Sequence, residues 1–166
     1  ILGANGPVPL IVPVEKGRGA KIAIRDLRIA YDEEWQRNHW RTIFSAYNSS
    51  PYFEYYADEI APFFRKKYNF LFDFNQEITD TLSEILEFET NFRKTDDFEA
   101  VSEYCLNLRE KISPKKNYTT EDQHFRPVEY TQVFSEKFGF VPNLSILDLI
   151  FNEGPSSSEI LETSFF

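Results

Sequence analysis

The sequence contains no methionine, one cysteine and two histidines among its 166 residues. The single cysteine, Cys105, cannot form a disulfide within the chain, so a reducing compartment fits the composition. The two histidines, His39 and His124, do not belong to any Cys-x-x-Cys or His-x-x-x-His pattern, which zinc sites commonly use. We therefore expect neither a metal nor another cofactor.

Long apolar runs are also missing. No run approaches the roughly 20 residues that cross a bilayer, and the opening "ILGANGPVPL" lacks the charged-then-apolar layout of a signal peptide. We expect no membrane insertion and a cytoplasmic location. The absence of methionine and the start at Ile1 further lead us to expect a natural segment upstream of residue 1.

Catalytic signatures are missing as well. The sequence has no G-x-S-x-G motif and no P-loop, so Ser/His/Asp hydrolysis and P-loop phosphoryl transfer have no support. The net charge of −9 would repel a nucleic-acid backbone, and we expect no nucleic-acid partner. With 42% hydrophobic and 27% charged residues, the composition is that of a globular protein, and its length predicts a single domain over residues 1–166.

The first segment predicts a small N-terminal antiparallel sheet. Apolar residues alternate from Pro7 to Val14, and the prolines within this stretch favour an edge strand. The expected partner is Lys21 to Ala30, where the apolar phase shifts near Arg25 and Asp26 and so predicts a bulge. This sheet could belong to a larger α/β sheet completed by upstream residues.

The connection between these strands, "EKGRGAK", forms a cationic tip. Gly17 and Gly19 permit a tight turn, and Lys16, Arg18 and Lys21 supply the charge. We favour a hairpin turn over a phosphate cradle, because a lone G-x-G is a weak signal.

Helical periodicity predicts that several helices pack against the sheet, which gives an α+β fold. Asp32, Ser50 and Ser145 are the expected N-caps, and Asp73 with Gln76 and Ser145 with Asp148 are the expected capping boxes. Pro62 should kink or end its helix. The predicted helices are Asp32–Tyr47, Ser50–Arg65, Asp73–Phe88 and Ser145–Glu153. The periodicity between Glu89 and Arg126 is poor, which is typical of loops.

The first predicted helix carries the candidate site. Arg37 and Arg41 lie four residues apart and could bind a phosphate, although Glu33 offers Arg37 an ordinary surface ion pair. His39 shares a face with Trp35, so a core histidine and a catalytic acid or base are both compatible with its position.

Aromatic and polar residues extend this list. Most of the aromatic residues should pack in the core; the possible ligand contacts are Trp40, Tyr47, Tyr52, Tyr55 and Tyr56. In the last predicted helix, Ser145, Asp148 and Asn152 align in one polar stripe. We favour a solvent face for this stripe over a polar wall of a pocket.

Three segments, "GPVPLIVPVEKG", "WQRNHWRTIFSAYNSSPYFEYY" and "GFVPNLSILDLIFNEGP", together resemble the WbqC-like protein family. The resemblance implies a cytoplasmic bacterial protein associated with surface-polysaccharide or O-antigen biosynthesis, and it implies an upstream segment that opens with a strand. Residues 89–126 depart from the pattern of the family.

The resemblance and the residues lead to two hypotheses. The first is a group-transfer enzyme that acts on a sugar nucleotide or another activated small molecule. Arg37 and Arg41 would hold the phosphate, Trp40, Tyr47, Asp148 and Asn152 would contact the substrate, and His39 would act as general acid or base. The alternative is a non-catalytic module that binds a partner enzyme of the same pathway. A homo-oligomer is open under either hypothesis.

Overall fold

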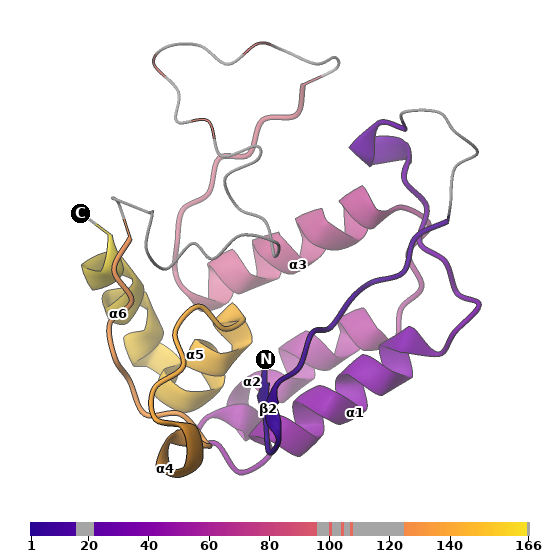
Figure 1. The fold of residues 1–166 in the computed structure, drawn as a ribbon. Helices are drawn as coiled ribbons and strands as arrows, with labels where there is room; N and C mark the ends of the chain where they lie inside the picture. Colours follow the sequence, from indigo (N-terminus) through magenta and orange to yellow (C-terminus); the bar gives the residue numbers. More distant parts are fainter. Residues whose placement is uncertain (16–21, 96–99, 101–103, 105–106, 108–124, 166) are drawn as a thin grey trace.

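The computed structural model describes residues 1–15, 22–95, 100, 104, 107 and 125–165 (Figure 1). Among these residues, helices dominate and the only named sheet has two strands, so the predicted α+β class is confirmed. In chain order the elements are β1 (Leu2–Gly3), β2 (Gly6–Pro7), η1 (Ile24–Asp26), α1 (Trp35–Tyr47), α2 (Phe53–Ile60), η2 (Ala61–Phe64), α3 (Leu71–Ile85), α4 (Ser135–Phe138), α5 (Ile146–Glu153), η4 (Gly154–Ser156) and α6 (Ser157–Ser164). The predicted cationic tip, Cys105 and His124 lie outside the described residues.

The N-terminal sheet is smaller than expected. β1 pairs with β2 in an antiparallel hairpin, whereas the predicted strand Pro7–Val14 is wrong for most of its length. Pairing resumes only at its far end, where Val14 forms an isolated antiparallel bridge with Ile29. The reason is the proline content, since Pro13 can only accept a bond, which comes from the Ala30 amide at 3.0 Å. The chosen partner segment was therefore correct, but a continuous ladder was not.

The predicted bulge at Arg25 and Asp26 is a short 3₁₀ helix. η1 spans Ile24–Asp26 and is followed by extended chain that bridges Phe70 through Arg28. A 3₁₀ turn changes the direction of successive side chains, and this explains the shift in apolar phase that the sequence showed. The prediction of a bulge is therefore wrong.

Helix α1 begins three residues later than predicted, and Asp32 does not cap it. Its N-cap is Glu34, which makes no side-chain capping bond. The first turn is held instead by Gln36, whose Nε2 donates to the carbonyl oxygens of Phe63 and Lys66 at 3.1 and 2.6 Å. Tertiary contacts therefore replace the local cap.

Helix α2 is also shorter than predicted. The hydroxyl of Ser50 does not cap α2, because it donates to the carbonyl of Tyr47 at 2.7 Å and so closes the end of α1. The regular α-helix ends at Ile60, and Pro62 lies in the 3₁₀ turn η2. The predicted break at this proline is confirmed.

Helix α3 begins at Leu71, before the predicted capping box. Its start is set by the pairing of the preceding chain, since the Leu71 amide donates to the carbonyl of Leu27 at 2.9 Å. Asp73 then lies within the first turn, and Gln76 donates to Asp80 at 2.8 Å. The predicted pair therefore makes no capping box.

Helix α5 begins as predicted, with Ser145 as N-cap accepting from the Leu147 amide. It ends at Gly154, which has φ of 53°, a conformation that glycine adopts without strain. A Cβ atom at this position would lie 2.4 Å from the ring of Tyr52, so the turn into α6 also needs glycine for space. The close approach fixes the start of α2 against the end of α5.

Two clusters of buried side chains hold these elements together. The first core cluster joins α1, α2 and α5 and contains Ile43, Ala46, Tyr47, Phe53, Ile60, Leu86, Leu147, Ile150 and Phe151. The second core cluster lies at the other end of α1 and contains Ile29, Trp35, Phe63, Tyr68 and Phe74. The buried face predicted for α1 contributes to both clusters, because Trp35 enters the second cluster while Ile43 and Ala46 enter the first.

Candidate functional site

Helix α1 presents two exposed guanidinium groups one turn apart. Arg37 forms an ion pair with Glu34 at 3.2 Å, so its partner is Glu34 rather than the expected Glu33. Arg41 is exposed and, among the described residues, forms no ion pair. Surface pairs of the Arg37 type contribute little stability, so a stronger anionic ligand could displace Glu34. We call Arg37 and Arg41 the arginine row; among the described residues, one of them has no acidic partner and the other forms a weak surface ion pair.

His39 lies on the opposite side of the same helix, because residues two apart do not face each other. Only 9% of its surface is exposed, and its ring packs edge-on against Trp35 with centroids 5.2 Å apart. Burial lowers the pKa of His39 below its ordinary value, while a hydrogen bond to the Ile11 backbone acts in the other direction. The structure thus places the imidazole among aromatic rings and away from the two arginines.

Trp40 occupies an intermediate position between these two faces. Its indole stacks on Phe53 and Phe64, with centroids 6.1 and 5.9 Å apart, and it is partly buried. Such packing fixes the ring and leaves part of it accessible. Trp40 therefore borders the first core cluster and can still contact a ligand at its exposed part.

Tyr47, at the end of α1, meets Asp148 of α5 in the interior. The Tyr47 hydroxyl donates to Asp148 Oδ1 at 2.8 Å, and both residues are almost completely buried. Asp148 Oδ2 accepts from the Tyr130 hydroxyl at 2.8 Å and from Gln132 Nε2 at 3.0 Å. An ionised aspartate can only accept hydrogen bonds, and three donors match it well. We call these four residues the Asp148 cluster.

Gln132 extends the Asp148 cluster into the chain before α5. Its Nε2 also donates to the Val141 carbonyl at 2.9 Å, and its Oε1 accepts from the Val141 amide at 2.9 Å. Together these bonds hold residues 130–141 against α5. The Asp148 cluster thus connects α1, α5 and the intervening loop through polar contacts in an otherwise apolar region.

The two tyrosines of the cluster remain protonated over the ordinary pH range. Burial is the main cause that raises the pKa of Tyr47, and the neighbouring Asp148 charge raises it further. The same two causes, in the same order, raise the pKa of Tyr130. Both phenols therefore act as hydrogen-bond donors toward the carboxylate.

The polar stripe on α5 is not a solvent face, so the interpretation favoured from the sequence is wrong. Asp148 and Asn152 are only 1% and 7% exposed. The Asn152 side chain donates to the backbone carbonyl of Asp148 at 2.7 Å, and Asp148 binds the three donors of its cluster in place of a capping-box contact. Asp148 and Asn152 turn inward because the surrounding chain supplies those donors, whereas Ser145 at the start of the stripe is exposed.

The structure brings together only part of the predicted site. Tyr47, Asp148 and Asn152 meet at one place. Arg37 and Arg41 lie on the surface. His39 lies along the second core cluster, and Trp40 lies along the first. Sequence analysis missed Tyr130 and Gln132 altogether. The available signal was the acidic residue in a nearly apolar helix, which requires buried donors from elsewhere in the chain.

The described residues hold neither a cluster of metal-ligating side chains nor a membrane-spanning helix. Within them, no three His, Cys, Asp or Glu side chains approach closely enough to hold a metal ion. The helices in the described part of the chain include none with the length and apolar character required for a membrane crossing.

One known protein family has a model that matches the segments of the chain containing α1 and α5. The model of the WbqC-like protein family matches residues 1–123 and 108–160, which include both α1 and α5. The chain belongs to the WbqC-like protein family. The matched residues contain both the arginine row and the Asp148 cluster. No curated protein and no solved structure matches the chain.

Proposed function

We propose that this WbqC-like chain binds a phosphate-bearing small molecule, such as a sugar nucleotide, and serves group transfer in surface-polysaccharide or O-antigen biosynthesis. The observation that carries the proposal is the pair of exposed arginines one turn apart on α1, of which only Arg37 has an acidic partner among the described residues. A guanidinium group matches phosphate oxygens in pairs, which makes this row a specific anion-binding surface.

In this proposal Arg41 makes the main phosphate contact, and Arg37 joins it after leaving Glu34. Trp40 follows Arg37 on the same helix and presents the exposed part of its ring to the sugar or base. A role for His39 as general acid or base requires the reacting group to reach the buried side of α1, because His39 lies away from the two arginines. Its lowered pKa favours the neutral form, which can accept a proton at neutral pH.

The Asp148 cluster has a supporting role in the same proposal. It fixes the end of α1 against α5 through the Tyr47 hydroxyl. Asn152 keeps the Asp148 backbone in place through its own side-chain bond. These residues would therefore position the helix that carries the arginines.

The proposed phosphate site is tested by calorimetric titration with uridine diphosphate glucose, uridine diphosphate and pyrophosphate. Arg41→Ala should weaken binding about tenfold to a hundredfold, because a hydrogen bond to a charged group contributes roughly 1.5 to 3 kcal/mol. Arg37→Ala should have a smaller effect, since Arg37 gives up its ion pair with Glu34 on binding. Arg65→Ala is the matched control, because Arg65 is exposed just after η2. Equal affinities in all four proteins would remove the site.

A non-catalytic binding module is the second candidate function. The observation that favours it is the separation of His39 from the arginines on opposite sides of α1. Phosphorus NMR of uridine diphosphate glucose, incubated with stoichiometric protein and with water as the acceptor of the glucosyl group, distinguishes the two candidates, because transfer breaks the glucosyl–phosphate bond and releases uridine diphosphate. Consumption of the donor that is lost in His39→Gln supports the enzyme. Binding without consumption supports the module.

A further inference from the structure

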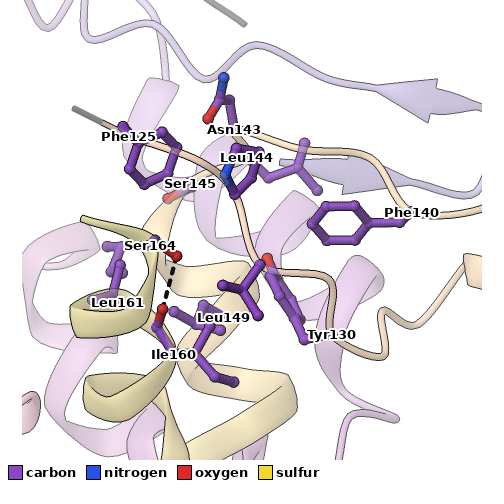
Figure 2. Close-up of a pocket in the computed structure, with 13 residues that line it drawn as sticks. Phe125, Tyr130, Phe140, Asn143, Leu144, Ser145, Leu149, Ile160, Leu161 and Ser164 are labelled. Atoms are coloured by element: carbon purple, nitrogen blue, oxygen red, sulfur yellow. Dashed lines mark hydrogen bonds between the residues drawn. The ribbon is translucent and has the colours of Figure 1, made fainter. Parts of the chain in front are cut away.

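A cavity of about 170 Å³ lies beside α5, next to the Asp148 cluster (Figure 2). Helix α6 forms one part of its boundary, and the chain before and after α4 forms the rest. Figure 2 shows Tyr130 and Phe140 on one side and Leu161 of α6 on the other. The lining residues are Phe125, Pro127, Val128, Tyr130, Phe140, Asn143, Leu144, Ser145, Ile146, Leu149, Ile160, Leu161 and Ser164.

Backbone pairing keeps this cavity preformed. Phe125 and Phe165 form an antiparallel bridge, and the Arg126 amide donates to the Ser164 carbonyl at 2.8 Å. The Ser164 hydroxyl is itself occupied, because it donates to the Ile160 carbonyl at 2.7 Å (Figure 2). The chain at Phe125 and Arg126 is thus fixed to the end of α6 before any ligand binds.

The chemistry of the lining defines the ligand. None of the lining residues carries a charge, and apolar side chains form most of the surface. Burying an ion against such a surface costs free energy without compensation, so phosphates and other charged groups are excluded here. The cavity is open to solvent on one side, and its volume is close to the roughly 150 Å³ of an enclosed engineered cavity that binds benzene.

Two polar groups remain available at the rim. Among the described residues, the side-chain amide of Asn143 has no hydrogen-bond partner. The hydroxyl of Ser145 accepts from the Leu147 amide, and within the same described ranges its own proton has no acceptor. Both groups can donate to one oxygen atom of a ligand whose apolar part fills the cavity.

We infer that this cavity binds an uncharged small molecule, or an uncharged substituent, with an apolar body of about the size of benzene and one hydroxyl or carbonyl oxygen at the rim. The site is independent of the arginine row, which binds anions on another face of the fold. Tyr130 links the cavity to the Asp148 cluster, because its ring lines the cavity while its hydroxyl donates to Asp148.

The test uses benzyl alcohol as probe and ¹⁵N-edited NMR titration of the whole chain. We expect saturable shifts confined to the amides of residues 125–130, 143–149 and 160–164, with a dissociation constant on the order of 1 mM or tighter. Benzoate and benzylamine should bind at least about tenfold more weakly, because each would bury a charge. Absence of saturation, or saturable shifts elsewhere, would overturn the inference.

Cavity-filling variants localise the binding. Leu161→Phe and Leu144→Phe should each weaken benzyl alcohol at least about tenfold while the dispersed spectrum of the folded protein persists. The matched control is Ile24→Phe, since Ile24 is exposed in a separate groove beside α3. Unchanged affinity in a folded filling variant would contradict the site. If neither variant folds, the shift pattern of the wild-type protein decides.

The oxygen contact is tested separately with Asn143→Gly. Asn143 has φ of 57°, so glycine removes the amide without straining the backbone. We expect benzyl alcohol to bind about threefold to tenfold more weakly, while toluene, which lacks the oxygen, binds as before. Equal losses for the two probes, or no loss for benzyl alcohol, would refute the role of Asn143.

Discussion

The two core clusters each contain or adjoin a buried polar side chain, but they accommodate it differently. Beside the first cluster, Asp148 receives hydrogen bonds from Tyr47, Tyr130 and Gln132. Beside the second, His39 packs against the rings of Trp35 and Phe64, and burial lowers its pKa. Hydrogen-bond donors that converge on a buried carboxylate offset the cost of burying it, whereas an imidazole can avoid that cost by losing its proton. The first solution needs three side-chain donors, whereas the second needs only aromatic rings and one backbone group.

The largest expected effect is the loss of the buried carboxylate. Asp148→Ala should lower the free energy of unfolding by about 3 to 5 kcal/mol, because it leaves several buried donors without their acceptor. Chemical denaturation measures the change. The control is Glu153→Ala on the same helix, where the carboxylate accepts only the exposed Thr131 amide at 3.3 Å, and we expect less than about 1 kcal/mol. Similar losses of unfolding free energy in both variants would show that the Asp148 cluster contributes no more to stability than the contact of Glu153.

A medium effect should distinguish the two tyrosines of the cluster. Tyr47→Phe should lower the free energy of unfolding by roughly 1.5 to 3 kcal/mol, since it removes a fully buried bond to a charged group. Tyr130→Phe should cost less, because Tyr130 is only partly buried and Gln132 still donates to the same oxygen. The denaturation measurements are the same as for Asp148. A larger loss for Tyr130→Phe would reverse this ranking.

The smallest effect concerns pH at His39. Its pKa is lower in the folded protein than the ordinary value of 6.5, so the unfolded chain binds the proton more readily. Stability is therefore complete above pH 6.5 and falls as the pH drops through 6.5 toward the folded pKa. For one proton the slope cannot exceed about 1.4 kcal/mol per pH unit.

His39→Gln is the matching variant, because an amide can keep the hydrogen bond to the Ile11 backbone while it cannot titrate. Unfolding curves between pH 5.5 and 7.5 should show a shallower pH dependence for His39→Gln than for the wild-type protein. Identical slopes would mean that the histidine is protonated equally in the folded and unfolded states.

Sequence patterns predicted what depends on neighbouring residues. The buried face of α1, the break at Pro62 and the cap at Ser145 are confirmed, because periodicity, proline geometry and capping act within one or two turns. The starts of α1 and α3 were wrong, since Gln36 and Leu71 fix them through contacts with other segments. Sequence rules that consider only neighbouring residues cannot predict such contacts between distant segments.

The candidate site shows the same division. The list of possible ligand contacts included Tyr47, Asp148 and Asn152, but their meeting point depends on Tyr130 and Gln132, which no local pattern connects to α5. The inward direction of the polar stripe depends on these two donors, which sequence analysis had not identified. The roles of Arg37, Trp40, Arg41 and His39 remain predictions that the titrations above will test.

The hydrogen bond between Tyr47 and Asp148 joins residues that are 101 positions apart. During synthesis, α1 leaves the ribosome long before α5 does. Until then the Tyr47 hydroxyl and the apolar face beside it lack their contacts with α5. Contacts of such sequence separation form late and slowly. The first core cluster is therefore completed only after α5 has been made.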